Sequence, residues 1–111
     1  MKIGEVWNVD FSPKVGDKIS KIRPAVIVNN NNMGALNLRV VVPVTDAIRN
    51  IREWHVFLKK NNTNNLSKDS VADCFQIKSL STTRFVSKRG DLSVQETDTV
   101  KICIMKVLDL I

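Results

Sequence analysis

A cationic segment stands directly before an arginine–proline pair near the start of the chain. Residues 14–24 read Lys-Val-Gly-Asp-Lys-Ile-Ser-Lys-Ile-Arg-Pro and lie between two apolar runs, residues 6–11 and 25–28. Pro24 favours extended backbone at Arg23, so the guanidinium is presented from a stiff base at the mouth of a buried strand. A guanidinium keeps its charge and offers a planar fork of donors that fits phosphate. The segment therefore predicts a site for a phosphate-bearing ligand.

Thr45 is the second residue with a suitable type and position, because it ends a predicted strand, residues 36–45, on the more polar of its two faces. Arginine, threonine and lysines without a metal suit one reaction well, the cleavage of RNA by its own 2′-OH. The enzyme then has to align that hydroxyl, stabilise the phosphorane and help protons to move. In this scheme Arg23 holds the phosphate and protonates the leaving oxygen, and Thr45 donates a hydrogen bond to a non-bridging oxygen.

Two questions stay open from the residues alone. Arginine remains protonated in proteins, so the scheme leaves the general base unassigned. An arginine in this position can also serve a structural ion pair, which is the competing interpretation of Arg23.

Other chemistries lack their residues. The chain has no P-loop, G-x-G-x-x-G, H-E-x-x-H or G-x-S-x-G motif, and its one histidine, His55, falls within a predicted strand. The carboxylates are scattered without a D-x-D pair of the kind that holds magnesium. Cys74 and Cys103 lie far apart in the sequence and are interpreted as buried, reduced thiols. We therefore predict no metal site and no cofactor.

Length and composition indicate one domain, residues 1–111, with an ordinary globular composition of 43% apolar and 25% charged residues. The net charge of +6 favours a polyanion such as nucleic acid, or an acidic partner, and also fits a protein that is merely basic. The start of the chain lacks the apolar region of a signal peptide, and no apolar run is long enough to cross a bilayer. These features predict a cytoplasmic protein that does not bind membranes.

The elements that must position these residues are mostly strands. Apolar patterning predicts strands over residues 6–11, 25–28, 36–45, 54–58 and 71–77, with an irregular basic segment at 79–92. Pro43 predicts an edge or a bulge near the end of its strand. Ser93 and Glu96 form the capping box of a terminal helix whose apolar arc runs from Val100 to Ile111. The expected fold is mainly β, a small bent antiparallel sheet of the SH3 or OB barrel kind, sealed by a C-terminal helix.

Four segments of the chain match a known pattern in the same order. Residues 4–13 fit an opening G-[DE]-[IV]-[WY] strand that ends in D-x-x-P, and Gly16 with residues 22–28 fits a glycine followed by an R-P-a-v-v-v segment. Residues 41–45 fit a V-x-P-[VC]-T strand end, and residues 70–71 with 76–80 resemble a later D-[QS] and Q-[IV]-[KR]-[ST] segment. Over its whole length, the sequence thus resembles the MazF/PemK toxin endoribonucleases of bacterial toxin–antitoxin pairs.

This resemblance implies a small SH3-like barrel of the CcdB/PemK type with a C-terminal helix, usually as a homodimer. It also implies metal-independent, sequence-specific cleavage of single-stranded RNA that leaves a 2′,3′-cyclic phosphate and a 5′-hydroxyl. An acidic, partly disordered antitoxin is the implied protein partner. The family's catalytic arginine and threonine fall on Arg23 and Thr45, its RNA-closing loop makes Lys18, Ser20 and Lys21 candidate backbone contacts, and Gln76 occupies a position often close to the bases.

The chain also departs from the family pattern. Lys18 and Ile19 stand where many members carry a glutamate and a glutamine, and Phe75 stands where some carry an aspartate. Cleavage is therefore expected to depend on Arg23 and Thr45. Two other functions fit the same fold: a non-catalytic, gyrase-binding toxin of the CcdB branch, which would use the tail helix, and a plain RNA-binding barrel without turnover.

Overall fold

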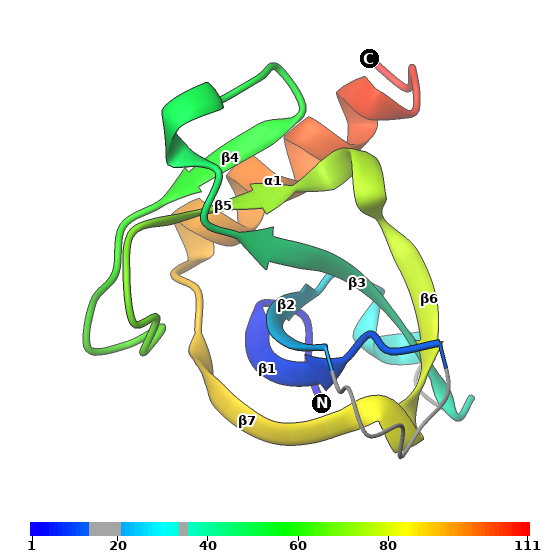
Figure 1. Cartoon of the computed structure of the whole chain (residues 1–111). Helices are drawn as coiled ribbons and strands as arrows, with labels where there is room; N and C mark the ends of the chain where they lie inside the picture. Colours follow the sequence, from blue (N-terminus) through cyan, green and yellow to red (C-terminus); the bar gives the residue numbers. More distant parts are fainter. Residues whose placement is uncertain (14–20, 34–35) are drawn as a thin grey trace.

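A computed structural model of the chain describes residues 1–13, 21–33 and 36–111, and within them seven antiparallel strands are followed by one α-helix (Figure 1). The strand order is β4-β5-β3-β2-β1-β7, with β6 paired to the other end of β3. The strands are β1 (Glu5–Asp10), β2 (Ile22–Ile27), β3 (Leu38–Thr45), β4 (His55–Leu58), β5 (Ser70–Asp73), β6 (Lys78–Ser81) and β7 (Phe85–Asp91). This arrangement confirms the predicted antiparallel sheet with a C-terminal helix.

The sheet is buried on both faces around β2, which lies between β1 and β3. Val26 belongs to a core cluster on one face, while Ala25 and Ile27 belong to a cluster on the other. Successive strand residues point to opposite faces, so a strand buried on both sides reads as a continuous apolar run. This explains why the short run at 25–28 correctly predicted a central strand.

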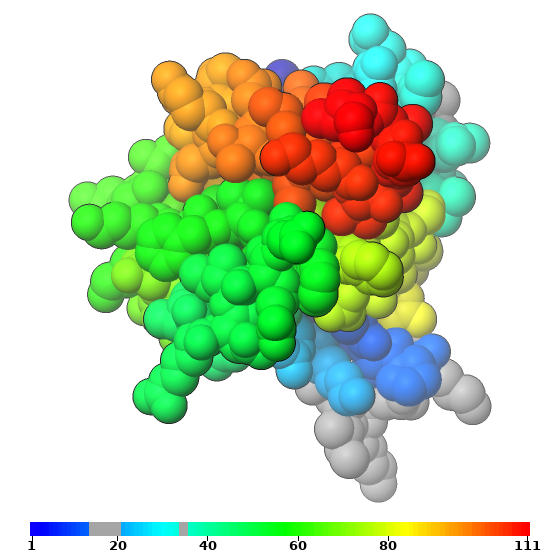
Figure 2. Space-filling view, turned by 90° about the horizontal axis from the view of Figure 1, so that it is seen from above, coloured from blue at the N-terminus to red at the C-terminus, as the bar shows by residue number. Residues whose placement is uncertain are grey.

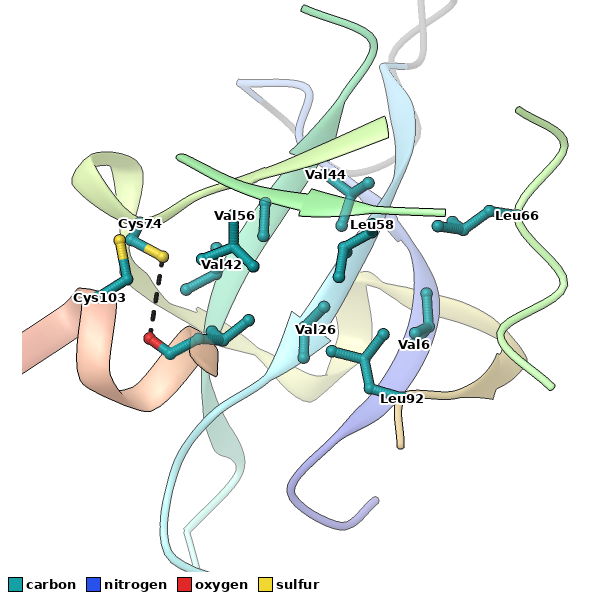
Figure 3. Close-up of a cluster of buried hydrophobic side chains, with 12 residues drawn as sticks. Val6, Val26, Val42, Val44, Val56, Leu58, Leu66, Cys74, Leu92 and Cys103 are labelled. Atoms are coloured by element: carbon teal, nitrogen blue, oxygen red, sulfur yellow. Dashed lines mark hydrogen bonds between the residues drawn. The ribbon is translucent and has the colours of Figure 1, made fainter. Parts of the chain in front are cut away.

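The larger cluster fills the space between the sheet and the helix (Figure 3). Its strand residues are mainly valines, which suit a pleated, half-buried surface. The buried members are Val6, Val26, Val42, Val44, Val56, Leu58, Leu66, Ala72, Cys74, Leu92, Val100 and Cys103.

The prediction of an irregular segment after residue 78 was wrong. Residues 79–92 are not irregular, because β6 pairs with β3, and β7 pairs with β1 through two register shifts. Pro43 lies in a central strand, but at a local gap in its pairing. It faces Ala25 of β2 on one side, and on the other it falls between the residues of β3 that pair with β6 and those that pair with β5. A proline is tolerated there because neither of these two ladders includes it.

The helix α1 (Val94–Val107) begins as predicted, with the Ser93 hydroxyl accepting from the Glu96 N–H and the Glu96 carboxylate accepting from the Ser93 N–H. It ends earlier than the apolar arc suggested, since Leu108 and Ile111 lie beyond it and are exposed. In Figure 2 its last turn (red) lies beside the segments that precede β4 and follow β5. Within the described residues, no helix combines the length and apolar character that a membrane span requires.

Cys74 and Cys103 are both buried and free, as predicted, and approach each other between η3 (Cys74–Gln76) and α1 (Figure 3). The Cys74 thiol donates weakly to the carbonyl of Val100 at 3.9 Å. Burial raises the pKa of Cys74 well above its usual range, and the neighbouring Cys103 and the charge of Asp73 raise it further. The native thiol therefore stays protonated at pH values at which an unfolded thiol ionises.

We expect this thiol to make the protein less stable at alkaline pH. The raised native pKa means that the native state holds one more proton than the unfolded state above about pH 8.5, where a free thiol titrates. The free energy of unfolding should then fall as pH rises, by at most about 1.4 kcal/mol per pH unit for this group. Urea unfolding of the wild type and of Cys74→Ala between about pH 7 and about pH 10 measures the difference. Parallel pH profiles for the two proteins would contradict the expectation.

Candidate functional site

A cavity of about 290 Å³ opens where the ends of β2 and β3 meet β7 and the loop that precedes β5. Arg23 and Thr45 both line it. The full lining consists of Ile22, Arg23, Pro24, Val44, Thr45, Asp46, Leu66, Ser67, Lys68, Ser70 and Arg89.

The strand register explains why residues far apart in sequence meet here. Ala25 faces Pro43 across the antiparallel β2–β3 ladder. Continuing the same register by two residues brings Arg23 opposite Thr45, and the two-residue period of a strand puts both on one face. Both side chains therefore point into the cavity from adjacent strand ends.

Arg23 is held firmly at its backbone and is open at its side chain. It faces Val9 of β1 in the ladder, and the following Pro24 is partly buried. The side chain is exposed, and no hydrogen bond or ion pair connects it to another residue of the described part of the chain. The competing interpretation, in which Arg23 forms a structural ion pair, finds no such partner in that part.

The cavity is cationic. Lys68 forms an ion pair of 2.8 Å with Asp46 at its rim, where both side chains are largely exposed. The hydrogen bond and charge of Lys68 hold the pKa of Asp46 below its usual range, and the charge of Arg23 contributes as well. With Arg89, three cations line the cavity against one carboxylate. Such a surface favours an anion with several oxygens, such as a phosphodiester.

Arg89 differs from Arg23 because its side chain is anchored. Its Nε donates to the carbonyl of Asn65 at 2.8 Å, and its Nη1 donates to Oδ1 of Asn8 at 3.2 Å. Arg89 therefore supplies positive charge and holds the cavity wall in place, while Arg23 is free to bind a ligand.

The other predicted contact residues lie elsewhere. Lys21 is exposed outside the lining of this cavity, and its carbonyl accepts from the Phe11 N–H at 2.9 Å. Gln76 is also exposed and outside this lining, with its Nε2 donating to Oδ2 of Asp73 at 2.7 Å. The predicted contacts Lys18 and Ser20 lie outside the described residues.

Arg84 is a structural residue of this region that the sequence interpretation missed. Its Nη1 donates to the carbonyls of Asp10 at 3.1 Å and Ser12 at 2.6 Å, and its Nη2 donates to that of Pro13 at 3.4 Å. Three carbonyls of one short segment thus converge on one guanidinium. Arg84 fixes the chain immediately before the cationic segment that begins at residue 14.

The sequence interpretation also missed three charged cavity residues, Asp46, Lys68 and Arg89. Asp46 directly follows Thr45, so its position offered a signal. Lys68 and Arg89 reach the cavity only through long-range packing, which no local pattern reports. Among the described residues, no three His, Cys, Asp or Glu side chains gather as metal ligands would.

Comparisons with known proteins agree with this architecture. Residues 2–108 match the family model of the PemK-like, MazF-like toxins of type II toxin–antitoxin systems. The endoribonuclease MazF9 of Mycobacterium tuberculosis is 34% identical over 99% of this chain and 98% of its own length. The endoribonuclease MazF of Staphylococcus saprophyticus is 32% identical over 94% of this chain and 88% of its own length.

A solved structure has the same fold at low sequence identity. It is an endoribonuclease in complex with its cognate antitoxin from a mycobacterial species, with a TM-score of 0.81 and 18% identity over 100% of this chain and 97% of that chain. The expected small barrel of the CcdB/PemK type is therefore confirmed. On the family match and the full-length relatives, the chain belongs to the PemK-like, MazF-like toxins of type II toxin–antitoxin systems.

Proposed function

We propose that this protein is the endoribonuclease toxin of a type II toxin–antitoxin pair, that residues 1–111 form one toxin domain, and that Arg23 and Thr45 carry the cleavage. The observation that supports these roles most is that both residues line one cationic cavity from adjacent strand ends. Its substrate is single-stranded RNA, cut by attack of the 2′-OH on the neighbouring phosphate.

In this mechanism the 2′-OH forms a bond to phosphorus, the bond to the 5′-oxygen breaks, and a 2′,3′-cyclic phosphate and a 5′-hydroxyl result. The guanidinium of Arg23 stabilises the extra negative charge of the phosphorane and gives a proton to the leaving oxygen. Thr45 donates a hydrogen bond to a non-bridging oxygen. Both groups act at positions already fixed by the β2–β3 register, so little reorganisation is needed during the reaction.

Asp46 has the position but not the properties of a general base. It is the one carboxylate among the described lining residues, but its lowered pKa makes it a weak proton acceptor at neutral pH. We assign it instead to holding Lys68 at the rim. The 2′-OH proton passes to solvent water, and Arg23 regains from solvent the proton that it gives to the leaving oxygen.

The protein acts as a homodimer in the cytoplasm and is blocked by an acidic antitoxin. The relative solved with its cognate antitoxin supports the existence of such a partner. The net charge of +6 and the three cations of the cavity support an acidic one. Because exposed charges are screened by salt, this association weakens at high ionic strength.

The activity is tested by incubating the purified protein with single-stranded RNA in the presence of a chelator and sequencing the new 5′ ends. We expect cleavage at a recurring short motif, with cyclic phosphate and 5′-hydroxyl termini. RNA with 2′-O-methyl groups at every position serves as control, since it lacks the nucleophile and should stay intact. Binding without cleavage of unmodified RNA would instead favour the plain RNA-binding barrel.

Thr45 provides the sharper test of the site. Thr45→Val keeps the shape of the side chain and removes the hydroxyl, so we expect the single-turnover cleavage rate to fall about 10²-fold. Thr45→Ser retains the hydroxyl and should keep most of the rate. Equal rates for the valine and serine variants would show that the hydroxyl takes no part.

A further inference from the structure

The loop that joins β4 to β5, residues 59–69, is held rigid by its own asparagines. Oδ1 of Asn61 accepts from the N–H groups of Thr63 at 2.9 Å and Asn64 at 2.8 Å. The fully buried Asn64 accepts from the N–H groups of Asn61 at 3.1 Å and Leu66 at 3.0 Å, and donates to the carbonyl of Lys59 at 2.9 Å. These contacts fix the loop's path from within.

The same loop is also fastened to β7 (Figure 1, left). Nδ2 of Asn65 donates to the carbonyl of Arg89 at 2.8 Å, while Nε of Arg89 donates back to the carbonyl of Asn65 at 2.8 Å. The N–H of Asp91 donates to the carbonyl of Thr63 at 3.0 Å. A loop this strongly constrained loses little conformational entropy on binding a ligand.

Two further cavities adjoin the one that holds Arg23, and residues of this loop line both of them. The larger, of about 570 Å³, shares Asp46 and Lys68 with it, and the other, of about 340 Å³, shares Leu66 and Ser67. Lys60 lines both of these additional cavities. The larger is lined by Asp46, Ala47, Ile48, Arg49, Lys60, Lys68 and Asp69, and the other by Lys60, Asn61, Asn62, Asn65, Leu66 and Ser67.

The charge of the first cavity continues into the larger of these two. Together they are lined by five cations and two carboxylates. Arg49 and Lys60 are exposed, and neither side chain forms an ion pair with another residue of the described ranges. Of these five cations, Lys68 is paired with Asp46 and Arg89 is hydrogen-bonded to Asn65 and Asn8. A row of cations in two adjoining cavities suits a ligand that is itself a chain of anions.

The lining favours a nucleic acid strand over an acidic peptide. The three cavities have no aromatic lining residue, and their large apolar lining residues are Ile22, Ile48 and Leu66. Since both peptide anchoring and base stacking use aromatic side chains, the preference for nucleic acid rests on the row of cations, which matches regularly spaced phosphates. Exposed amide and hydroxyl groups, such as those of Asn62 and Ser67, also offer donors and acceptors to ribose and base edges.

On the basis of the ribonuclease function above, we propose that residues 59–69, together with Arg49, form a preorganised binding surface for the RNA strand beside the cleaved phosphate. Arg49, Lys60 and Lys68 bind the neighbouring phosphates. In the free protein Lys68 is paired with the Asp46 carboxylate. When RNA enters, Lys68 leaves this carboxylate and binds a phosphate of the RNA instead.

The test measures binding of an RNA of about 12 nucleotides with 2′-O-methyl groups at every position, which cannot be cleaved. We expect Arg49→Ala/Lys60→Ala to raise the dissociation constant about tenfold. The slope of log Kd against log salt concentration should fall by about 1.4, since each phosphate contact on a single strand contributes about 0.7. The matched control, Lys101→Ala/Lys106→Ala, removes two exposed cations of α1 and should change neither quantity.

RNA length provides a second measurement. A dinucleotide contains one phosphodiester and fills only the first cavity, so its binding, followed by NMR titration, should be nearly the same for the wild type and the double variant. Thermal unfolding checks that both variants are folded, which the exposure of all four side chains favours.

Three outcomes separate this inference from the function on which it rests. If the wild type cleaves RNA but the Arg49/Lys60 variant binds the long RNA like its control, the proposed binding surface is wrong and the ribonuclease function is retained. If the variant loses affinity for polyglutamate but not for RNA, the cavities bind an acidic protein partner, and the proposed RNA-binding surface is again wrong. If the wild type leaves unmodified RNA intact, the ribonuclease proposal fails, whatever the binding shows.

Discussion

Replacing Arg23 with alanine is expected to lower the single-turnover rate of RNA cleavage by about 10³-fold or more, as loss of a transition-state arginine does in phosphoryl transfer. The side chain is the one cation of the cavity that stands free of hydrogen bonds and ion pairs within the described residues. Its charge is therefore available to the phosphorane. Arg23→Lys keeps a charge without the planar fork and should recover only part of the rate.

In Arg23→Ala, kcat and KM should change to different extents. Because Arg23 acts mainly on the transition state, kcat should fall much more than KM rises. Stability should be unchanged, because the side chain is exposed. Arg52→Ala removes an exposed arginine that does not line this cavity and serves as the matched control. If Arg23→Ala cleaves RNA as fast as Arg52→Ala does, Arg23 has no role in the mechanism.

Gly90→Ala is expected to lower the free energy of unfolding by about 3 kcal/mol, the upper part of the range for overpacking a buried site. A Cβ at this position would lie 2.3 Å from the carbonyl oxygen of Thr63 and 2.7 Å from the carbonyl carbon and oxygen of Asn64. These are backbone atoms, so they can move only if the β4–β5 loop moves away from β7. The change should therefore cost RNA affinity as well as stability.

Urea unfolding measures the first effect, and binding of the uncleavable RNA measures the second. Val86→Ala provides the control, since Val86 is 56% exposed on the same strand. If Gly90→Ala unfolds at the same urea concentration as Val86→Ala, the loop is not packed against β7 in solution as the structure describes it.

Much of the fold could be predicted where sequence pattern and burial coincide. β2 was recognised because its three consecutive buried residues alternate between two cores. The helix start was recognised because a capping box is a local signal. By contrast β7 was missed, because most of its side chains are polar or exposed and its pairing with β1 contains two register shifts. Its partner lies almost at the other end of the chain, which no local pattern can reveal.

The residues of the candidate site also differ in how far the sequence predicts them. Arg23 and Thr45 mark strand ends that the sequence makes visible, and the register brings them together. Lys68 comes from a polar loop whose path depends on the buried side chain of Asn64. This loop falls between two predicted strands, residues 54–58 and 71–77. An asparagine whose buried side chain shapes a turn cannot be distinguished in the sequence from one that faces solvent.

The division of labour within residues 59–69 has an evolutionary consequence. The shape of the loop depends on the side-chain hydrogen bonds of Asn61, Asn64 and Asn65. The side chains of Asn62 and Ser67 are exposed and form no hydrogen bond within the described residues. Mutations at the outward positions can alter which RNA is preferred without refolding the scaffold. Duplicated toxin genes could thus diverge in target while keeping one architecture, and a library randomised only at the outward positions is the natural starting point for redirecting specificity.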